Sequence, residues 1–223
     1  MGAESQHDRI IARAAKGRLQ PLGCFQKGRS RTWIDDHGWW IGVIEFQPSG
    51  WSKGSYLNVG ACWMWYAKDF LSFDDGYRVE DFHPFRYNEQ FEQVAAALAE
   101  RATIEVETLR RRFRSLEMVA EYLIAKQAGD KDLWAHYNAG VAAGLVGDAG
   151  TAKARLAKVV AAPEQEVPWI LELKEKSAFL LGLADDASRF RSQTAAVIGR
   201  ARDLLKLPKG NEAIDEITAG GQS

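Results

Sequence analysis

The fold is decided by residues 39–66, which read WWIGVIEFQPSGWSKGSYLNVGACWMWY. Two runs rich in β-branched and aromatic residues are separated by a turn at 48–54 that is rich in Gly and Ser. Upstream, residues 31–35 run into a short polar stretch that ends in Gly38, as in a β-hairpin. The pattern predicts an antiparallel meander of three strands, and residues 77–80 can supply a fourth strand at its edge.

The residues on either side of this meander have the spacing of helices. Ile10, Ile11 and Leu19 recur at helical spacing before Pro21 ends the pattern, and the chain is helical in pattern from Asn88 almost to its end. The fold class expected is therefore α+β. It consists of an antiparallel three- to four-stranded meander packed with helices, followed by an all-helical tail of antiparallel helix pairs.

We expect two domains, because nothing after Gly129 has the character of a strand. Residues 1–129 form the α+β sheet domain, and residues 130–223 form the helical tail. Within the tail, residues 144–149 (GLVGDA) recur in similar form at 182–187 (GLADDA), and each copy falls between two expected helices.

A basic run occurs near the end of the long helix that begins at Asn88, where Arg110, Arg111 and Arg112 are consecutive. Glu105 and Glu107 precede the run and can pair with it along the helix. We expect a solvated, ion-paired helix face rather than a phosphate site.

The first helix pair of the tail, residues 133–163, resembles a degenerate tetratricopeptide repeat. Members of that family pack antiparallel helix pairs into surfaces that bind other proteins, so the resemblance implies a protein-binding role. A plain helical bundle with one Gly-Asp turn is the alternative. The resemblance depends on Trp134, Ala139-Gly140, Gly147-Asp148, Ala152 and Pro163.

Residues 21–65 resemble a family of small bacterial proteins known only as a domain of unknown function. The resemblance implies an α+β fold and no particular activity. It depends on Leu22-Gly23, Lys27-Gly28, Trp39 to Gln47, Ser49 and Tyr56-Leu57-Asn58-Val59-Gly60.

Charge and composition exclude several classes of protein. The formal net charge is -1 and the sequence pI is about 6.4, so no overall field attracts nucleic acid or an anionic membrane. No apolar stretch is long enough to span a membrane, and residues 1–16 lack the apolar core of a signal peptide. Cys24 and Cys62 have neither disulfide-framework nor zinc-site spacing. We expect a soluble, cytoplasmic protein without a cofactor or a metal site.

Tryptophan is concentrated in the meander, which holds six of the eight: Trp33, Trp39, Trp40, Trp51, Trp63 and Trp65. We expect most of these indoles to pack in the core.

Trp51 differs because it lies in a loop, where a large aromatic residue more often makes contacts with a partner. The polar residues Gln47, Ser49, Lys53 and Asn58 surround it, so these five form the candidate binding site. A structural hydrogen bond is the alternative role for Asn58.

A catalytic alternative uses His83 with the nearby carboxylates Glu80 and Asp81. Ser52 could add a nucleophile, because residues 50–54 (GWSKG) match the Gly-x-Ser-x-Gly pattern of a nucleophile elbow. An elbow needs a helix after the Ser, whereas this loop precedes an expected strand, so a plain turn is favoured. A true active site should bring His83 and at least two carboxylates together at the floor of a pocket.

The function expected is that of a non-catalytic binding module whose partner is another protein. No catalytic residue is assigned under this hypothesis, and an immunity-like or antitoxin-like role would suit such a chain. The alternative is a small hydrolase or nucleotide-modifying enzyme using His83 and its carboxylates. The helical tail leaves open a homo-oligomer.

The domain boundary can be tested by limited proteolysis. We expect cleavage near Gly129 to release a stable fragment, because the boundary should be an exposed linker. Circular dichroism and size-exclusion chromatography of the products would measure this. Loss of structure in both halves after a single cut would show that the tail is integral to one fold.

Overall fold

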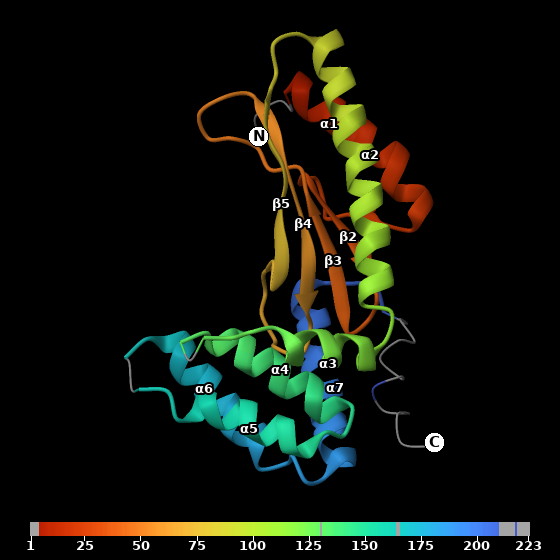
Figure 1. Cartoon of the computed structure of the whole chain (residues 1–223). Coiled ribbons are helices and arrows are strands. Elements are labelled where there is room, and N and C mark those ends of the chain that lie inside the picture. Colours follow the sequence, from red (N-terminus) through yellow and green to blue (C-terminus); the bar gives the residue numbers. More distant parts are fainter. Residues whose placement is uncertain (1–4, 130, 164–165, 210–216, 218–223) are drawn as a thin grey trace. The chain divides into compact units, whose positions relative to one another are not determined.

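The computed structural model describes residues 5–129, 131–163, 166–209 and 217 (Figure 1). The chain divides into two compact units. The first comprises residues 1–63 and 68–111, and the second comprises residues 64–67 and 112–223. The boundary predicted at Gly129 falls inside the second unit and stays a prediction.

The first unit contains a five-stranded antiparallel sheet whose strands follow one another in chain order. The strands are β1 (Phe25–Gln26), β2 (Thr32–Asp36), β3 (Trp40–Glu45), β4 (Gly54–Trp63) and β5 (Asp75–Pro84). Its helices are α1 (Gln6–Leu19), the short 3-10 helix η1 (Gln20–Leu22) and most of α2 (Asn88–Arg112). The predicted α+β meander is therefore confirmed, with the two-residue strand β1 as an addition.

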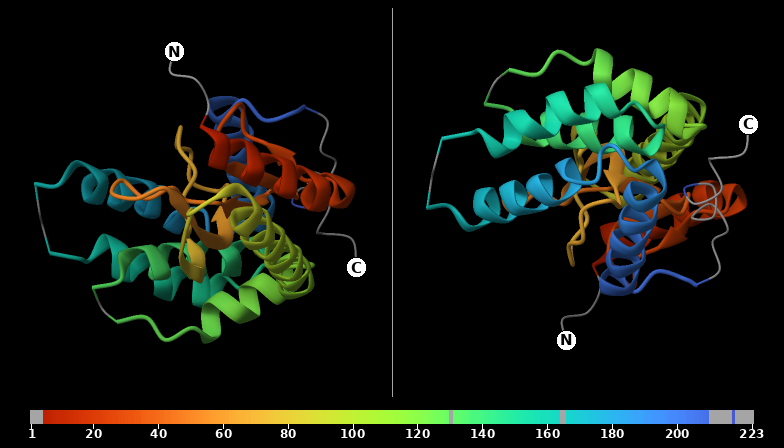
Figure 2. Two further views of the ribbon diagram at one scale, coloured as in Figure 1. Left: turned by 90° about the horizontal axis from the view of Figure 1, so that it is seen from above. Right: turned by 90° about the horizontal axis from the view of Figure 1, so that it is seen from below.

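The register of the sheet places Trp33, Ile44, Val59 and Tyr77 opposite one another, so their side chains share one face. Helices α1 and α2 lie side by side along this face (Figure 1 and Figure 2). The hydroxyl group of Tyr77 donates to Glu105 of α2 at 2.5 Å, which ties β5 to that helix.

Two ion pairs join α1 to α2. Arg13 lies 2.6 Å from Glu92, and Arg18 lies 3.0 Å from Glu100. All four side chains are about half exposed or more, so these pairs contribute little to stability.

Most of the tryptophan residues in and beside the sheet are buried, as predicted, including Trp33 and Trp63. The rings of Trp39 and Trp63 stack with their centroids 6.5 Å apart. Trp51 is the exception, with 98% of its surface exposed. Burial of large aromatic groups thus supplies much of the apolar core of the first unit.

One buried carboxylate joins the sheet to α2. Asp35 in β2 is 3% exposed and accepts hydrogen bonds from Arg110 at 2.5 and 2.9 Å. His37 lies 2.8 Å from the same carboxylate, and Arg110 also donates to the carbonyl of Leu22 at 2.7 Å. The expectation that the basic run pairs along its own helix is wrong for Arg110, because its partner lies on β2.

The pKa of Asp35 follows from these contacts. Burial alone would raise it, but the hydrogen bonds from Arg110 and His37 outweigh burial and hold the pKa below its ordinary value of 3.8. Asp35 is therefore ionised at neutral pH.

The second unit is built around α4, most of which is buried. Helices α3, α5 and α7 pack against α4, and α6 packs against α5. Its helices are α3 (Leu116–Ala125), α4 (Leu133–Leu145), α5 (Ala149–Val160), α6 (Pro168–Leu181) and α7 (Ala187–Leu205). This confirms the predicted all-helical region of paired helices.

The internal repeat has a local explanation in helix capping. Asp148 and Asp186 occupy matching positions in the two copies. Each carboxylate accepts a backbone N–H one turn into the next helix, that of Thr151 and that of Arg189 respectively. The repeat therefore corresponds to two helices, α5 and α7, that begin with the same capping interaction. The tetratricopeptide resemblance stays a prediction.

Close packing around α4 depends on glycine. A Cβ atom at Gly144 would lie 2.3 Å from the ring of Phe190 in α7, and one at Gly140 would lie 2.8 Å from Leu156 in α5. Both neighbouring helices approach α4 where it has no side chain.

No helix in the described part of the chain has the length and apolar character needed to cross a membrane.

The Asp35 network predicts a pH-dependent stability. We expect Asp35→Asn to lower the free energy of unfolding at pH 7 by about 2–3 kcal/mol, because the charge-assisted hydrogen bonds from Arg110 are lost. The contribution of Asp35 is fully present above its unfolded pKa and is lost as pH falls through its lowered folded pKa. Urea denaturation at several pH values should show that the difference in the free energy of unfolding between the wild type and Asp35→Asn becomes smaller below about pH 4.

The control is Asp69→Asn, which removes an exposed carboxylate of the same unit and should change little. If Asp35→Asn lowers the free energy of unfolding by the same amount at every pH down to acid unfolding, the stabilising role given to the ionised Asp35 is contradicted.

A glycine pair tests the packing of α4. We expect Gly144→Ala to destabilise the chain by about 1–3 kcal/mol, since the methyl group would overlap Phe190. Gly199 in α7 has no atom within 4 Å of the corresponding position, so Gly199→Ala should stabilise by about 0.5–1 kcal/mol. We expect Gly144→Ala to lower the midpoint of thermal unfolding and Gly199→Ala to raise it. If both variants shift the midpoint equally, the close contact between Gly144 and Phe190 is contradicted.

Candidate functional site

The loop predicted to bind a partner forms the tip of the β3–β4 hairpin. Trp51 projects from it almost fully exposed. The hydroxyl group of Ser49 accepts the backbone N–H of Trp51 at 3.2 Å, so Ser49 shapes the turn. Lys53 has an exposed side chain, and its carbonyl accepts the N–H of Phe85 at 2.9 Å. The loop therefore presents Trp51 to solvent at the tip of the hairpin.

The other two candidate residues, Gln47 and Asn58, belong to a polar network on the sheet. The amide nitrogen of Asn58 donates to Gln47 at 2.9 Å and to Glu45 at 3.0 Å. Arg78 donates to Gln47 at 3.1 Å and lies 4.1 Å from the ring centroid of Tyr56. Asn58 therefore makes the structural hydrogen bonds given above as its alternative role, and its binding role stays a prediction.

The alternative catalytic residues lie on β5 and on the hairpin loop. His83 lies 3.6 Å from Glu80, and both side chains are 40% exposed. Asp81 and Ser52 are exposed. Among the described residues Ser52 makes no hydrogen bond to His83, so the structure brings one carboxylate to the histidine and leaves the proposed nucleophile apart.

A concave site occurs in the second unit, between α6 and α7, where a cavity of about 350 Å³ opens. Its size falls within the range of small-molecule and side-chain pockets. The apolar part of its lining comes from Trp65, Tyr137, Phe179, Leu180 and Val197. We call this cavity the α6/α7 groove.

The aromatic lining of the groove is held by buried hydrogen bonds. The indole N–H of Trp65 donates to Asn138 of α4 at 2.9 Å. The hydroxyl group of Tyr137 donates to the carbonyl of Trp65 at 3.0 Å. Because both polar groups already have partners, the rings present apolar faces without an unpaired donor.

Tyr66 borders this floor and is fixed by its neighbours. Its ring meets those of Trp134 and Tyr137 edge to face, with centroids 4.8 and 5.9 Å apart. The ammonium group of Lys176 lies 4.0 Å from the Tyr66 centroid and 2.6 Å from Glu172. Burial, and then the hydrogen bond to Glu172, raise the pKa of Tyr66, so its hydroxyl group stays neutral.

The rim of the groove carries charges of opposite sign. Glu175 on α6 and Arg200 on α7 both line the cavity and are exposed. Neither makes an ion pair with any residue in the described part of the chain. An apolar floor with one free acid and one free base at its edge is suited to binding, and it offers no activated nucleophile.

Sequence reasoning did not find this groove. Its residues come from Trp65, from Tyr137 in α4 and from the consecutive helices α6 and α7, which follow Trp65 by about a hundred residues or more. Phe179 lies at the groove and is 56% exposed in the structure, but the large apolar residues Trp169 and Leu171 of the same helix are exposed as well. Periodicity alone could not show that it lies at the mouth of a cavity.

No family model matches the chain, and no curated protein or solved structure matches it. Function is therefore inferred from the chemistry of the α6/α7 groove and of the surfaces described above.

Proposed function

We propose that this chain is a binding protein whose helical unit holds a short segment of another protein in the α6/α7 groove. The observation that carries the proposal is the groove itself, a concave apolar site with a preformed aromatic lining and convergent polar groups at its edge.

The apolar floor of the groove favours a partner segment that carries a large apolar side chain, called the anchor below. A volume of about 350 Å³ accommodates one or two large side chains rather than a folded surface. Aromatic or large aliphatic residues gain most from such a pocket, because desolvated aromatic anchors dominate the energy of protein interfaces. Phe179, exposed at the mouth, would cover the bound anchor.

The free charges on the rim set the orientation of the segment. A basic residue would face Glu175 on α6, and an acidic residue would face Arg200 on α7. The segment expected is therefore amphipathic, with an apolar anchor between residues of opposite charge, as in the binding of a helix to a groove.

The exposed Trp51 supplies a second candidate contact in the first unit. A tryptophan at an exposed tip inserts into a pocket on a partner, whereas the groove receives a side chain from one. The polar loop residues around Trp51 would form the rim of that contact.

The enzyme alternative, a small hydrolase or nucleotide-modifying enzyme, has less support. Among the described residues, Glu80 is the one carboxylate within ion-pair distance of His83, and both side chains are too exposed for water to be excluded from the reaction. An immunity-like or antitoxin-like role agrees with a protein-binding groove and is proposed by analogy alone.

A display selection with random short peptides tests the proposal. We expect selected peptides to share an aromatic or large aliphatic anchor flanked by charges of opposite sign. Phe179→Ala should weaken their binding by about tenfold or more, measured by isothermal titration calorimetry, because the cover over the anchor is lost. Leu204→Ala is the matched control, since Leu204 is also a half-exposed residue of the helical unit but does not line the groove.

Exchanging the charges of Arg200 and of its partner residue in the peptide distinguishes binding in the α6/α7 groove from binding at the Trp51 loop. Arg200→Glu should weaken the same peptides, and replacing their acidic residue with lysine should restore binding. Selected peptides that are insensitive to Phe179→Ala and Arg200→Glu but lost on Trp51→Ala would move the site to the hairpin loop.

A further inference from the structure

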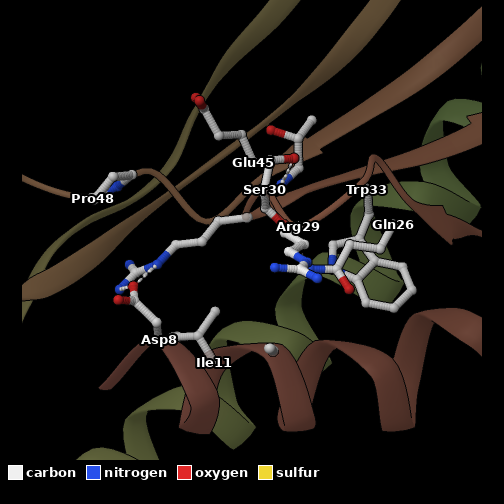
Figure 3. Close-up of a pocket in the computed structure, with 11 residues that line it drawn as sticks. Asp8, Ile11, Gln26, Arg29, Ser30, Trp33, Glu45 and Pro48 are labelled. Atoms are coloured by element: carbon white, nitrogen blue, oxygen red, sulfur yellow. Dashed lines mark hydrogen bonds and ion pairs between the residues drawn. The ribbon is translucent and has the colours of Figure 1, made fainter. Parts of the chain in front are cut away.

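A second cavity, of about 420 Å³, lies in the first unit between α1 and the first strands of the sheet (Figure 3). It is unrelated to the α6/α7 groove, since all of its lining belongs to the first unit. Ile11 and Ala12 of α1 and Pro48 supply apolar walls. We call it the α1 cavity.

One ion pair at the edge of this cavity is formed within the protein, although the Nη2 atom of Arg31 is buried without a hydrogen-bond partner among the described residues. Arg31 is 11% exposed, donates to Asp8 at 2.7 Å and to the carbonyl of Gly54 at 3.0 Å, and so neutralises the Asp8 carboxylate. Burial would raise the pKa of Asp8, but hydrogen bonds from Ser5 and Arg31 outweigh it and lower that pKa. The pair therefore adds no net charge to the cavity.

Arg29 is different because its guanidinium group has no partner in the described part of the chain. Figure 3 shows it beside Trp33 and Gln26, on the side of the cavity opposite Asp8. Glu45 also borders the cavity, but its carboxylate is directed away from α1 and accepts the amide of Asn58 at 3.0 Å. The α1 cavity thus has one unpaired positive charge.

Trp33 adds a hydrogen-bond donor. Its side chain is only 3% exposed and lines the cavity, yet within the described residues its indole N–H donates to no group. Among the described residues, the buried polar atoms that lack a hydrogen-bond partner do not include this N–H, so it is accessible to solvent and free to meet an acceptor. An acceptor placed in the cavity could meet both this donor and the Arg29 guanidinium group.

We propose that the α1 cavity binds a small organic carboxylate. Its carboxylate group would accept hydrogen bonds from Arg29 and from the indole N–H of Trp33, and its apolar body would lie against Ile11, Ala12 and Pro48. A carboxylate fits better than a phosphate ester, which carries about −1.5 to −2 charges at pH 7 against one unpaired arginine. A second positive charge would require Arg31 to leave Asp8.

The test is a titration of the full chain with three probes: benzoate, its uncharged analogue benzamide, and inorganic phosphate. The readout is the indole N–H signal of Trp33 in a ¹H–¹⁵N NMR spectrum, assigned by its absence in Trp33→Phe. We expect benzoate to shift this signal saturably and benzamide to leave it unchanged. Arg29→Gln should weaken benzoate binding about tenfold, because a charge-assisted hydrogen bond is lost.

Arg111→Gln is the control, since it removes an exposed arginine of the same unit outside the cavity. If Trp33→Phe does not fold, calorimetry with Arg29→Gln, whose side chain is exposed, gives the same comparison. The proposal is overturned if benzoate produces no saturable change, if benzamide binds equally well, if phosphate binds more tightly than benzoate, or if Arg29→Gln has no effect. None of these outcomes bears on the α6/α7 groove.

Discussion

Asp35 holds a negative charge inside the first unit, and a buried charge is tolerated only where donors surround it. Arg110 supplies two hydrogen bonds from α2, and His37 adds a contact from the turn after β2. Because Arg110 also donates to Leu22, one side chain joins α2, β2 and the segment that follows α1. This network therefore links α2 and the end of the α1–η1 segment to the sheet, and the α1 cavity lies between α1 and the same sheet.

The second unit depends on contacts made where a side chain is absent. Gly144 allows Phe190 to bring α7 against α4, while α6 packs mainly against α5 and touches α4 where Trp169 stacks on Trp134. A cavity opens between α6 and α7, and Tyr137 and Trp65 line it. The α6/α7 groove is thus a consequence of helix packing, and its apolar character follows from hydrogen bonds that already satisfy the polar atoms of its lining.

The two cavities share one principle of recognition. In each, most of the charged groups are paired within the protein, and apolar side chains lie beside a small number of charges that have no partner in the described part of the chain. Glu175 and Arg200 together suit a segment with two opposite charges, whereas Arg29 alone suits a single anion. Unpaired charges of this kind decide what is bound more than the volumes do, because apolar walls accept many shapes but an unpaired charge accepts only its complement.

Much of the fold could be predicted from the sequence, because its signals are local. Period-two patterning at 39–66 predicted the hairpins, the repeat at 144–149 and 182–187 marked junctions between helices, and the position of Trp51 in a Gly-bounded loop indicated its exposure. Only the tertiary structure decided that Arg110 pairs with Asp35, that Asn58 is held by Glu45 and Gln47, and that the α6/α7 groove and the α1 cavity form. Those contacts join residues far apart in the chain, and periodicity carries no information about which distant side chains meet.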